Sequence, residues 1–154
     1  MMTDDQDSFK LVGLKLHGKT TNQNNQSSMD CGSLWQKFEA DHIFNQIPRK
    51  LSDEIYAVYF EYEKDETSPF SYFIGCKVDT NDITPEGLSE LIIPAQKYKR
   101  HTAKGTMPAC IADAWKEIWN SDLNRSFEYD FEVYGERSRD WSNAEVDIFI
   151  SATY

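Results

Sequence analysis

Two stretches near the C-terminus decide the fold: residues 127–134 read FEYDFEVY and residues 145–150 read EVDIFI. Both alternate with a period of two, which predicts β-strands because successive side chains of a strand point to opposite faces of the sheet. Placing a carboxylate among aromatic rings costs free energy unless hydrogen-bond donors or a cation contact it. A protein that binds cations can tolerate this cost. The first strand carries Phe127, Tyr129, Phe131 and Val133 on one face and Glu128, Asp130, Glu132 and Tyr134 on the other.

The first half of the chain predicts a strand, a helix and two further strands. The helix is capped by Asp30 or Ser33, ends before Pro48 and carries one apolar face. The preceding segment, residues 18–29, is rich in Asn, Gln and Ser and is expected to be a loop. The strands are expected at residues 9–17, 55–62 and 70–78.

The second half predicts the same order of elements. Residues 91–99 form a strand in which Pro94 lies at an edge or a bulge. Thr106 is expected to cap a helix that has Pro108 in its first turn. Two strands follow, at residues 127–134 and 146–152. The helix carries one apolar stripe, formed by Ile111, Ala114, Trp115, Ile118 and Trp119.

This repetition predicts an α+β fold built from a duplicated strand–helix–strand–strand unit. Such a unit favours an antiparallel sheet with two main helices on one face, flanking a central ligand cleft. A single domain is expected over residues 9–154, with halves at about residues 9–79 and 91–154. Residues 1–8 are expected to form a polar N-terminal tail.

Charge and composition exclude several classes of function. The formal net charge of −10 argues against direct nucleic-acid binding, which needs clustered Lys and Arg. The N-terminus lacks the basic and apolar segments of a signal peptide. No run approaches the roughly 18 apolar residues of a membrane span, so we expect a cytoplasmic protein without a membrane partner.

The sequence also predicts no cofactor and no metal. It has no glycine-rich phosphate loop and no H-E-x-x-H motif. The three cysteines show no C-x-x-C spacing. The three histidines, His17, His42 and His101, lie in separate predicted elements, where ordinary surface positions explain them better than metal binding.

Five segments, in this order and spacing, resemble a known superfamily. They are residues 70–78 (FSYFIGCKV), 93–98 (IPAQKY), 114–119 (AWKEIW), 130–134 (DFEVY) and 144–150 (AEVDIFI). The chain is similar to the gyrase-inhibitory-protein-like proteins, also described as the effector-binding domains of AraC-type and MerR-type multidrug regulators. The resemblance runs from about Phe9 to the end of the chain.

The resemblance implies a cleft that binds lipophilic organic cations. In regulators of this family a glutamate contacts the positive charge of the ligand, and the resemblance places this glutamate at Glu132. Because no DNA-binding arm is evident, we expect an effector-binding domain on its own. Aromatic side chains offer flat walls and cation–π contacts of roughly 0.5–2 kcal/mol each. The aromatic candidates for ligand binding are Trp35, Phe38, Tyr59, Tyr72, Trp115, Trp119 and Tyr134.

Each candidate also has a purely structural interpretation. Trp115 and Trp119 on a helical stripe are as often core residues as ligand walls, and Tyr134 could hydrogen-bond the Glu132 carboxylate. Glu128 and Asp130 are expected to be solvated.

Two other classes of function stay open. Some proteins of the superfamily hydrolyse reactive cyclopropane-bearing toxins, and Glu132 could then act as a general base on water. The third alternative is a protein-binding module whose partner is gyrase or a regulator.

Overall fold

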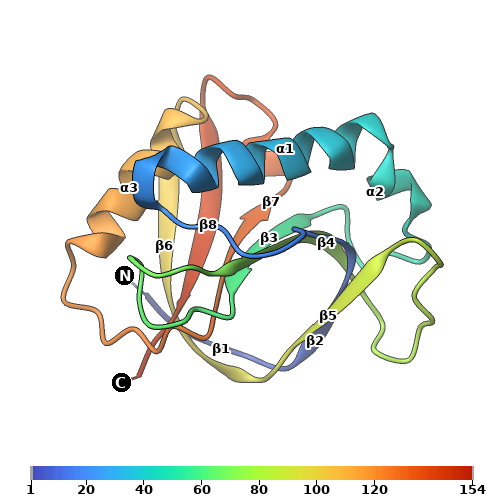
Figure 1. Ribbon diagram of the computed structural model, residues 1–154, viewed down its shortest axis with the longest axis horizontal. Coiled ribbons are helices and arrows are strands. Elements are labelled where there is room, and N and C mark those ends of the chain that lie inside the picture. Colours follow the sequence, from blue (N-terminus) through green and yellow to red (C-terminus); the bar gives the residue numbers. More distant parts are fainter. Residues whose placement is uncertain (1, 154) are drawn as a thin grey trace.

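One antiparallel sheet of eight strands curls into a half-barrel, and two main helices lie along one side of it (Figure 1). This computed structural model describes residues 2–153. The predicted α+β class, with an antiparallel sheet and two main helices, is confirmed. The strands are β1 (Met2–Gln6), β2 (Phe9–Lys15), β3 (Ile55–Phe60), β4 (Ser71–Val78), β5 (Ser89–Ile93), β6 (Gln96–Gly105), β7 (Tyr129–Tyr134) and β8 (Ala144–Ser151). The helices are α1 (Gln26–Ala40), α2 (Ile43–Gln46) and α3 (Ala109–Trp119), with short 3-10 turns at η1 (Gln23–Asn25) and η2 (Glu136–Ser138).

The strand order is the same in both halves of the sheet. The complete order is β1-β6-β8-β7-β3-β4-β2-β5. Outward from the central β7–β3 pair, one side therefore reads β7-β8-β6 and the other reads β3-β4-β2. Each side ends in an edge strand that comes from the other part of the chain, since β5 pairs with β2 and β1 pairs with β6.

The prediction that residues 1–8 form a polar N-terminal tail must be corrected, because part of this segment is a strand. Residues 2–6 form β1, which pairs with residues 96–100 of β6. Their polar composition was misleading because an edge strand is held mainly by backbone hydrogen bonds, which need no apolar side chains.

The strand predicted over residues 91–99 is in fact two strands. Pro94 separates β5 from β6 instead of lying within one strand. Proline has no backbone N–H for the ladder, and the chain changes partners here, from β2 to β8 and β1.

Both helices begin without the predicted side-chain caps. Helix α1 starts at Gln26, so Asp30 and Ser33 lie inside it. Asn24 and Asn25 adopt left-handed backbone angles, with φ of 56° and 58°, and turn the chain into the helix. Helix α3 follows Pro108, and no side-chain hydrogen bond caps it. Buried residues such as Leu34 and Ile118 hold these helices on the sheet, which compensates for weak caps.

Aromatic residues fill the inside of the curl. This cluster consists of strand residues only and includes Phe9, Phe73, Tyr98, Phe131 and Phe149. The ring centroids of Phe9 and Phe131 are 5.6 Å apart although two strands, β3 and β4, separate β2 from β7 in the sheet. The sheet must curl strongly to allow this contact, and two further clusters lie on the opposite face, beneath α1 and α3.

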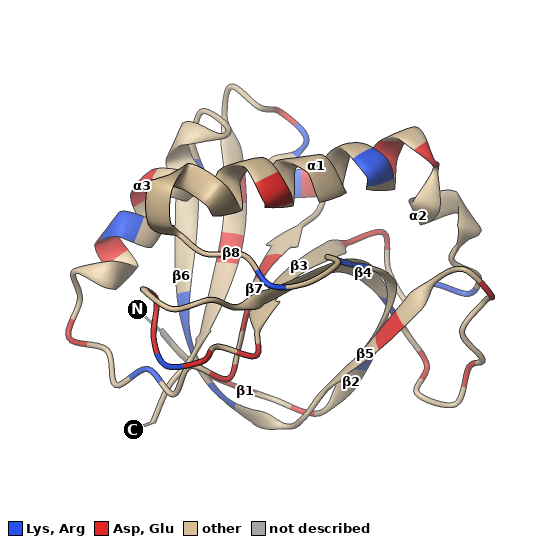
Figure 2. Ribbon diagram, viewed as in Figure 1, with Lys and Arg blue, Asp and Glu red and all other residues tan. Residues whose placement is uncertain are grey.

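Charged residues are distributed over many elements. Figure 2 shows Asp and Glu on the helices, strands and connecting loops rather than gathered on one of them. None of the helices within residues 2–153 combines the length and hydropathy that crossing a bilayer requires.

The backbones of β2 and β4 approach each other closely, and a substitution at this point tests the strand pairing. A Cβ atom added at Gly75 would lie 2.5 Å from the Val12 carbonyl oxygen, a contact that the paired backbones cannot relieve cheaply. We expect Gly75→Ala to lower the free energy of unfolding by about 1–3 kcal/mol in urea titrations. The control is Gly32→Ala inside α1, where no neighbour lies within 4 Å, and it should raise stability by up to about 1 kcal/mol. Equal effects of the two substitutions would contradict the strand pairing.

Candidate ligand-binding site

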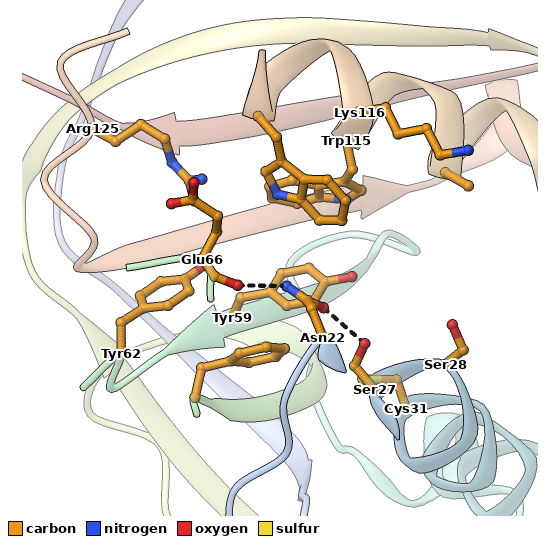
Figure 3. Close-up of a pocket in the computed structure, with 13 residues that line it drawn as sticks. Asn22, Ser27, Ser28, Cys31, Tyr59, Tyr62, Glu66, Trp115, Lys116 and Arg125 are labelled. Atoms are coloured by element: carbon orange, nitrogen blue, oxygen red, sulfur yellow. Dashed lines mark hydrogen bonds between the residues drawn. The ribbon is translucent and has the colours of Figure 1, made fainter. Parts of the chain in front are cut away.

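A pocket of about 210 Å³ opens between α1 and α3 (Figure 3). Both helices contribute side chains to it, and the end of β3 and the segments around it complete the wall. The lining residues are Asn22, Ser27, Ser28, Cys31, Tyr59, Tyr62, Glu66, Phe70, Ala112, Trp115, Lys116, Trp119 and Arg125.

Glu132 lies buried directly behind two of these lining residues. Its carboxylate Oε2 accepts hydrogen bonds from Trp115 Nε1 at 2.6 Å and from Tyr59 Oη at 2.9 Å. Its Oε1 accepts a hydrogen bond from Tyr134 Oη at 2.6 Å. Only 1% of the residue is exposed. The strand alternation directs it to the helix side, and the small Ala57 is its neighbour on β3.

Burial changes the protonation behaviour of this group. Removal from water raises the pKa of Glu132 above its ordinary value of 4.5, and its three hydrogen bonds offset this only in part. Burial, together with the nearby Glu132 charge, also raises the pKa values of Tyr59 and Tyr134 well above 10.0. Both phenols therefore stay protonated and remain donors.

Further aromatic residues extend this hydrogen-bonded cluster away from the pocket. Trp35 Nε1 donates to Tyr72 Oη at 2.8 Å, and the Trp35 ring lies 5.2 Å from that of Tyr134. The rings of Tyr59 and Tyr72 are 5.0 Å apart. Glu132 is thus surrounded by rings that also contact one another.

The structure brings most of the predicted site residues together, but at different depths. Tyr59, Trp115 and Trp119 line the pocket. Glu132, Tyr134, Tyr72 and Trp35 lie behind this wall, in the cluster just described. Phe38 does not line the pocket: it is buried in the core cluster beneath α1, where its ring centroid lies 6.1 Å from that of Trp35.

Asp130 is not solvated, which corrects the expectation made from its polar strand face. It is fully buried, and its Oδ2 accepts hydrogen bonds from Arg125 Nη2 and Tyr62 Oη, each at 2.7 Å. Its Oδ1 accepts hydrogen bonds from the Ser151 backbone N–H and Oγ. A nearby guanidinium makes burial of this carboxylate tolerable, which strand periodicity cannot reveal. Glu128, by contrast, is exposed as expected.

Several lining residues were not found by sequence reasoning. Arg125 and Tyr62 follow the ends of α3 and β3, in segments with no periodic pattern. The only signal for Arg125 was the need of Asp130 for a positive partner. Asn22 and Ser27 lie in the polar segment predicted as a loop and are joined by a hydrogen bond of 2.8 Å. Within residues 2–153, no three His, Cys, Asp or Glu side chains gather to hold a metal ion.

Comparison with known proteins identifies the family. Residues 4–151 match Cass2, described as integron-associated effector binding protein. The chain belongs to this family. The resemblance proposed from the sequence, to effector-binding domains of the gyrase-inhibitory-protein-like type, is thereby confirmed.

Solved structures show the same fold. The integron cassette protein VCH_CASS2 of Vibrio cholerae is 26% identical, with a TM-score of 0.74 over 99% of this chain and 95% of that one. SAV2435, solved bound to tetraphenylphosphonium, has a TM-score of 0.80 at 18% identity and covers 99% of this chain and 93% of its own. At that identity SAV2435 supports the fold alone.

A curated relative is longer than this chain. The transcriptional regulator BrlR of Pseudomonas aeruginosa is 31% identical over 152 residues, which are 93% of this chain and 52% of BrlR. The chain therefore spans about half the length of that regulator.

The raised pKa of Glu132 predicts a pH-dependent cost in stability. Between pH 4.5 and the raised value, the folded protein keeps a proton on Glu132 that the unfolded chain has released. The tighter proton binding of folded Glu132 therefore stabilises the fold fully below pH 4.5, and this stabilisation is lost as the pH rises through the raised pKa. Relative to Glu132→Gln, wild-type protein should lose up to about 1.4 kcal/mol per pH unit in this window. Urea unfolding at several pH values measures the difference, and a difference independent of pH would contradict the burial of an ionisable carboxylate.

Proposed function

We propose that this protein binds lipophilic organic cations in the pocket between α1 and α3, with Glu132 as their counter-charge. The observation that carries the proposal is the placement of one carboxylate behind the pocket wall. Two of its three hydrogen-bond donors, Tyr59 and Trp115, are themselves wall residues.

The electrostatics of a buried carboxylate support a cationic ligand. Three neutral donors satisfy the Glu132 carboxylate, and no positively charged side chain of residues 2–153 forms an ion pair with its negative charge. In a medium less polar than water, that charge attracts a cation at the pocket more strongly than an exposed carboxylate would. The rings of Tyr59, Trp115 and Trp119 can contact the apolar parts of the ligand, so recognition needs little directional hydrogen bonding.

The size of the pocket implies that binding opens it. Pockets for drug-sized ligands usually measure about 300–1,000 Å³, whereas this one measures about 210 Å³. Movement of the Trp115 and Tyr59 rings would enlarge the pocket and bring a ligand nearer to Glu132. The fold shared with SAV2435 in its tetraphenylphosphonium complex makes that cation a suitable first probe.

The repeated strand order supports the finer architecture. It agrees with a duplicated strand–helix–strand–strand unit in which the cleft between the two main helices is the ligand site. By the match to BrlR, we further propose that this domain corresponds to the ligand-binding part of longer regulators.

The geometry favours binding over general-base hydrolysis. A general base must touch the water that it activates, but Glu132 is shielded from solvent and lies behind Tyr59 and Trp115. A hydrolytic water would first have to pass these wall residues.

The central test compares Glu132→Gln with wild-type protein. Loss of the negative charge should weaken tetraphenylphosphonium binding at least about tenfold in isothermal titration calorimetry, equivalent to roughly 1.4 kcal/mol. Wild-type affinity should also fall as the pH is lowered through the raised pKa of Glu132, and the variant should lack this dependence. The matched control is Glu128→Gln, which removes an equal charge at an exposed position nearby. Equal affinities for wild type and Glu132→Gln would refute the proposal.

Trp119 offers a second test because it reaches the pocket without belonging to the core. It is 40% exposed, so Trp119→Ala should leave stability nearly unchanged. We expect it to weaken tetraphenylphosphonium binding by about 2- to 30-fold, the range of one cation–π contact. Trp141→Ala, at another exposed tryptophan that does not line the pocket, should bind as wild type does. Indistinguishable affinities for the two variants would remove Trp119 from the site.

A further inference from the structure

We propose that Arg125 forms a second subsite in the same pocket, which accepts a carboxylate on the ligand. The preferred ligands would then be lipophilic zwitterions, with a cationic centre directed to Glu132 and an anionic oxygen directed to Arg125. This inference rests on the proposed function, because it assumes that the pocket receives organic cations.

The hydrogen-bonding of Arg125 is incomplete. Its side chain is 7% exposed, and Nη2 donates to Asp130 Oδ2 at 2.7 Å. Its other two nitrogens, Nε and Nη1, are buried and have no hydrogen-bond partner among the described residues. Buried donors without acceptors are unfavourable and uncommon, so these two N–H groups need an acceptor that the folded chain does not supply.

Asp130 cannot supply that acceptor. Both of its oxygens already accept two hydrogen bonds, from Arg125, Tyr62 and Ser151. The guanidinium is also held in place by rings, since its Cζ lies 4.3 Å from the centroid of Phe127 and 5.9 Å from that of Trp115. The N–H groups of a guanidinium fixed in this way can each donate a charge-assisted hydrogen bond to a carboxylate oxygen.

The position of Arg125 puts its side chain at the pocket wall. Arg125 lines the pocket together with Trp115, one of the two rings that cover Glu132. Lys116 also lines the pocket, so two of the three charged lining residues are positive. A ligand with only positive charge would meet these two cations, whereas a zwitterion can satisfy both Glu132 and Arg125.

Glu66 is the side chain that a ligand carboxylate would replace. Figure 3 shows it directed toward Arg125, but no ion pair within 4.0 Å joins the two side chains in the described part of the chain. Its backbone carbonyl accepts a hydrogen bond from Asn22, while its half-buried carboxylate lines the pocket. Because Nε and Nη1 are shielded, an entering carboxylate must displace a wall residue, and Glu66 is the one with matching charge.

The experiment compares two ligands that differ only in the anionic group. These are (carboxybutyl)triphenylphosphonium and its methyl ester, with tetraphenylphosphonium as the reference that lacks an oxygen. Wild-type protein should bind the carboxylate at least about tenfold more tightly than the ester in titration calorimetry, the effect expected of a charge-assisted hydrogen-bonded pair. In Glu66→Gln, where the competing carboxylate is gone, this preference should increase.

Variants of Arg125 complete the test. Arg125→Lys keeps a positive partner for Asp130 but loses the two spare donors, so the preference for the carboxylate should fall to about twofold or less. If that variant unfolds, Arg125→Met combined with Asp130→Asn removes both charges of the buried pair and should give the same loss of preference.

The two proposals fail in different ways. If wild-type protein binds the ester as tightly as the carboxylate while still binding tetraphenylphosphonium, the Arg125 subsite is refuted and the cation site stands. A preference that persists in the Arg125 variants would also refute the subsite. Absence of tetraphenylphosphonium binding to wild-type protein would refute the cation site itself.

Discussion

The buried carboxylate of Glu132 is the constraint on which the arrangement of the site depends. Its donors come from three elements, with Tyr59 on β3, Trp115 on α3 and Tyr134 on β7. Breaking any one bond would leave part of a buried charge unsatisfied, so the three side chains hold one another in place. In the ligand-free protein the wall between α1 and α3 is therefore held by a polar group that a folding core alone would not require.

A second buried carboxylate, Asp130, differs from Glu132 in the charge of its partners. Asp130 and Glu132 lie two positions apart on the same face of β7, and both are almost completely buried. Asp130 is neutralised by the Arg125 guanidinium, whereas the donors that bond Glu132 in the described part of the chain are all neutral. Attraction for a cation thus remains at Glu132, while Asp130 fixes the guanidinium that lies at the pocket wall.

Sequence reasoning succeeded where a local pattern determines the structure. The alternation in residues 127–134 placed Glu132 and Tyr134 on one face, and the helical period placed Trp115 on the apolar stripe of its helix. Sequence reasoning failed where contacts between separate segments of the chain determine the structure. Residues 2–6 form a strand only because β6 offers a free edge, and Arg125 is buried only because Asp130 is nearby. Phe38 and Trp115 carry the same kind of helical signal, yet only the tertiary packing puts the first in the core and the second at the pocket.

The neutral donors around Glu132 explain how one site can be stable when empty and still favour positive charge. Tyrosine and tryptophan hydrogen bonds lower the cost of burying the carboxylate, but burial still dominates and raises its pKa. A cation beside the same group contributes a full opposite charge in a poorly solvated place, which neutral donors cannot match. The gain depends mainly on charge and ring contact, not on the outline of the ligand. Selectivity between ligands would then have to come from polar groups at the wall, and Arg125 has two buried donors there without a partner among the described residues.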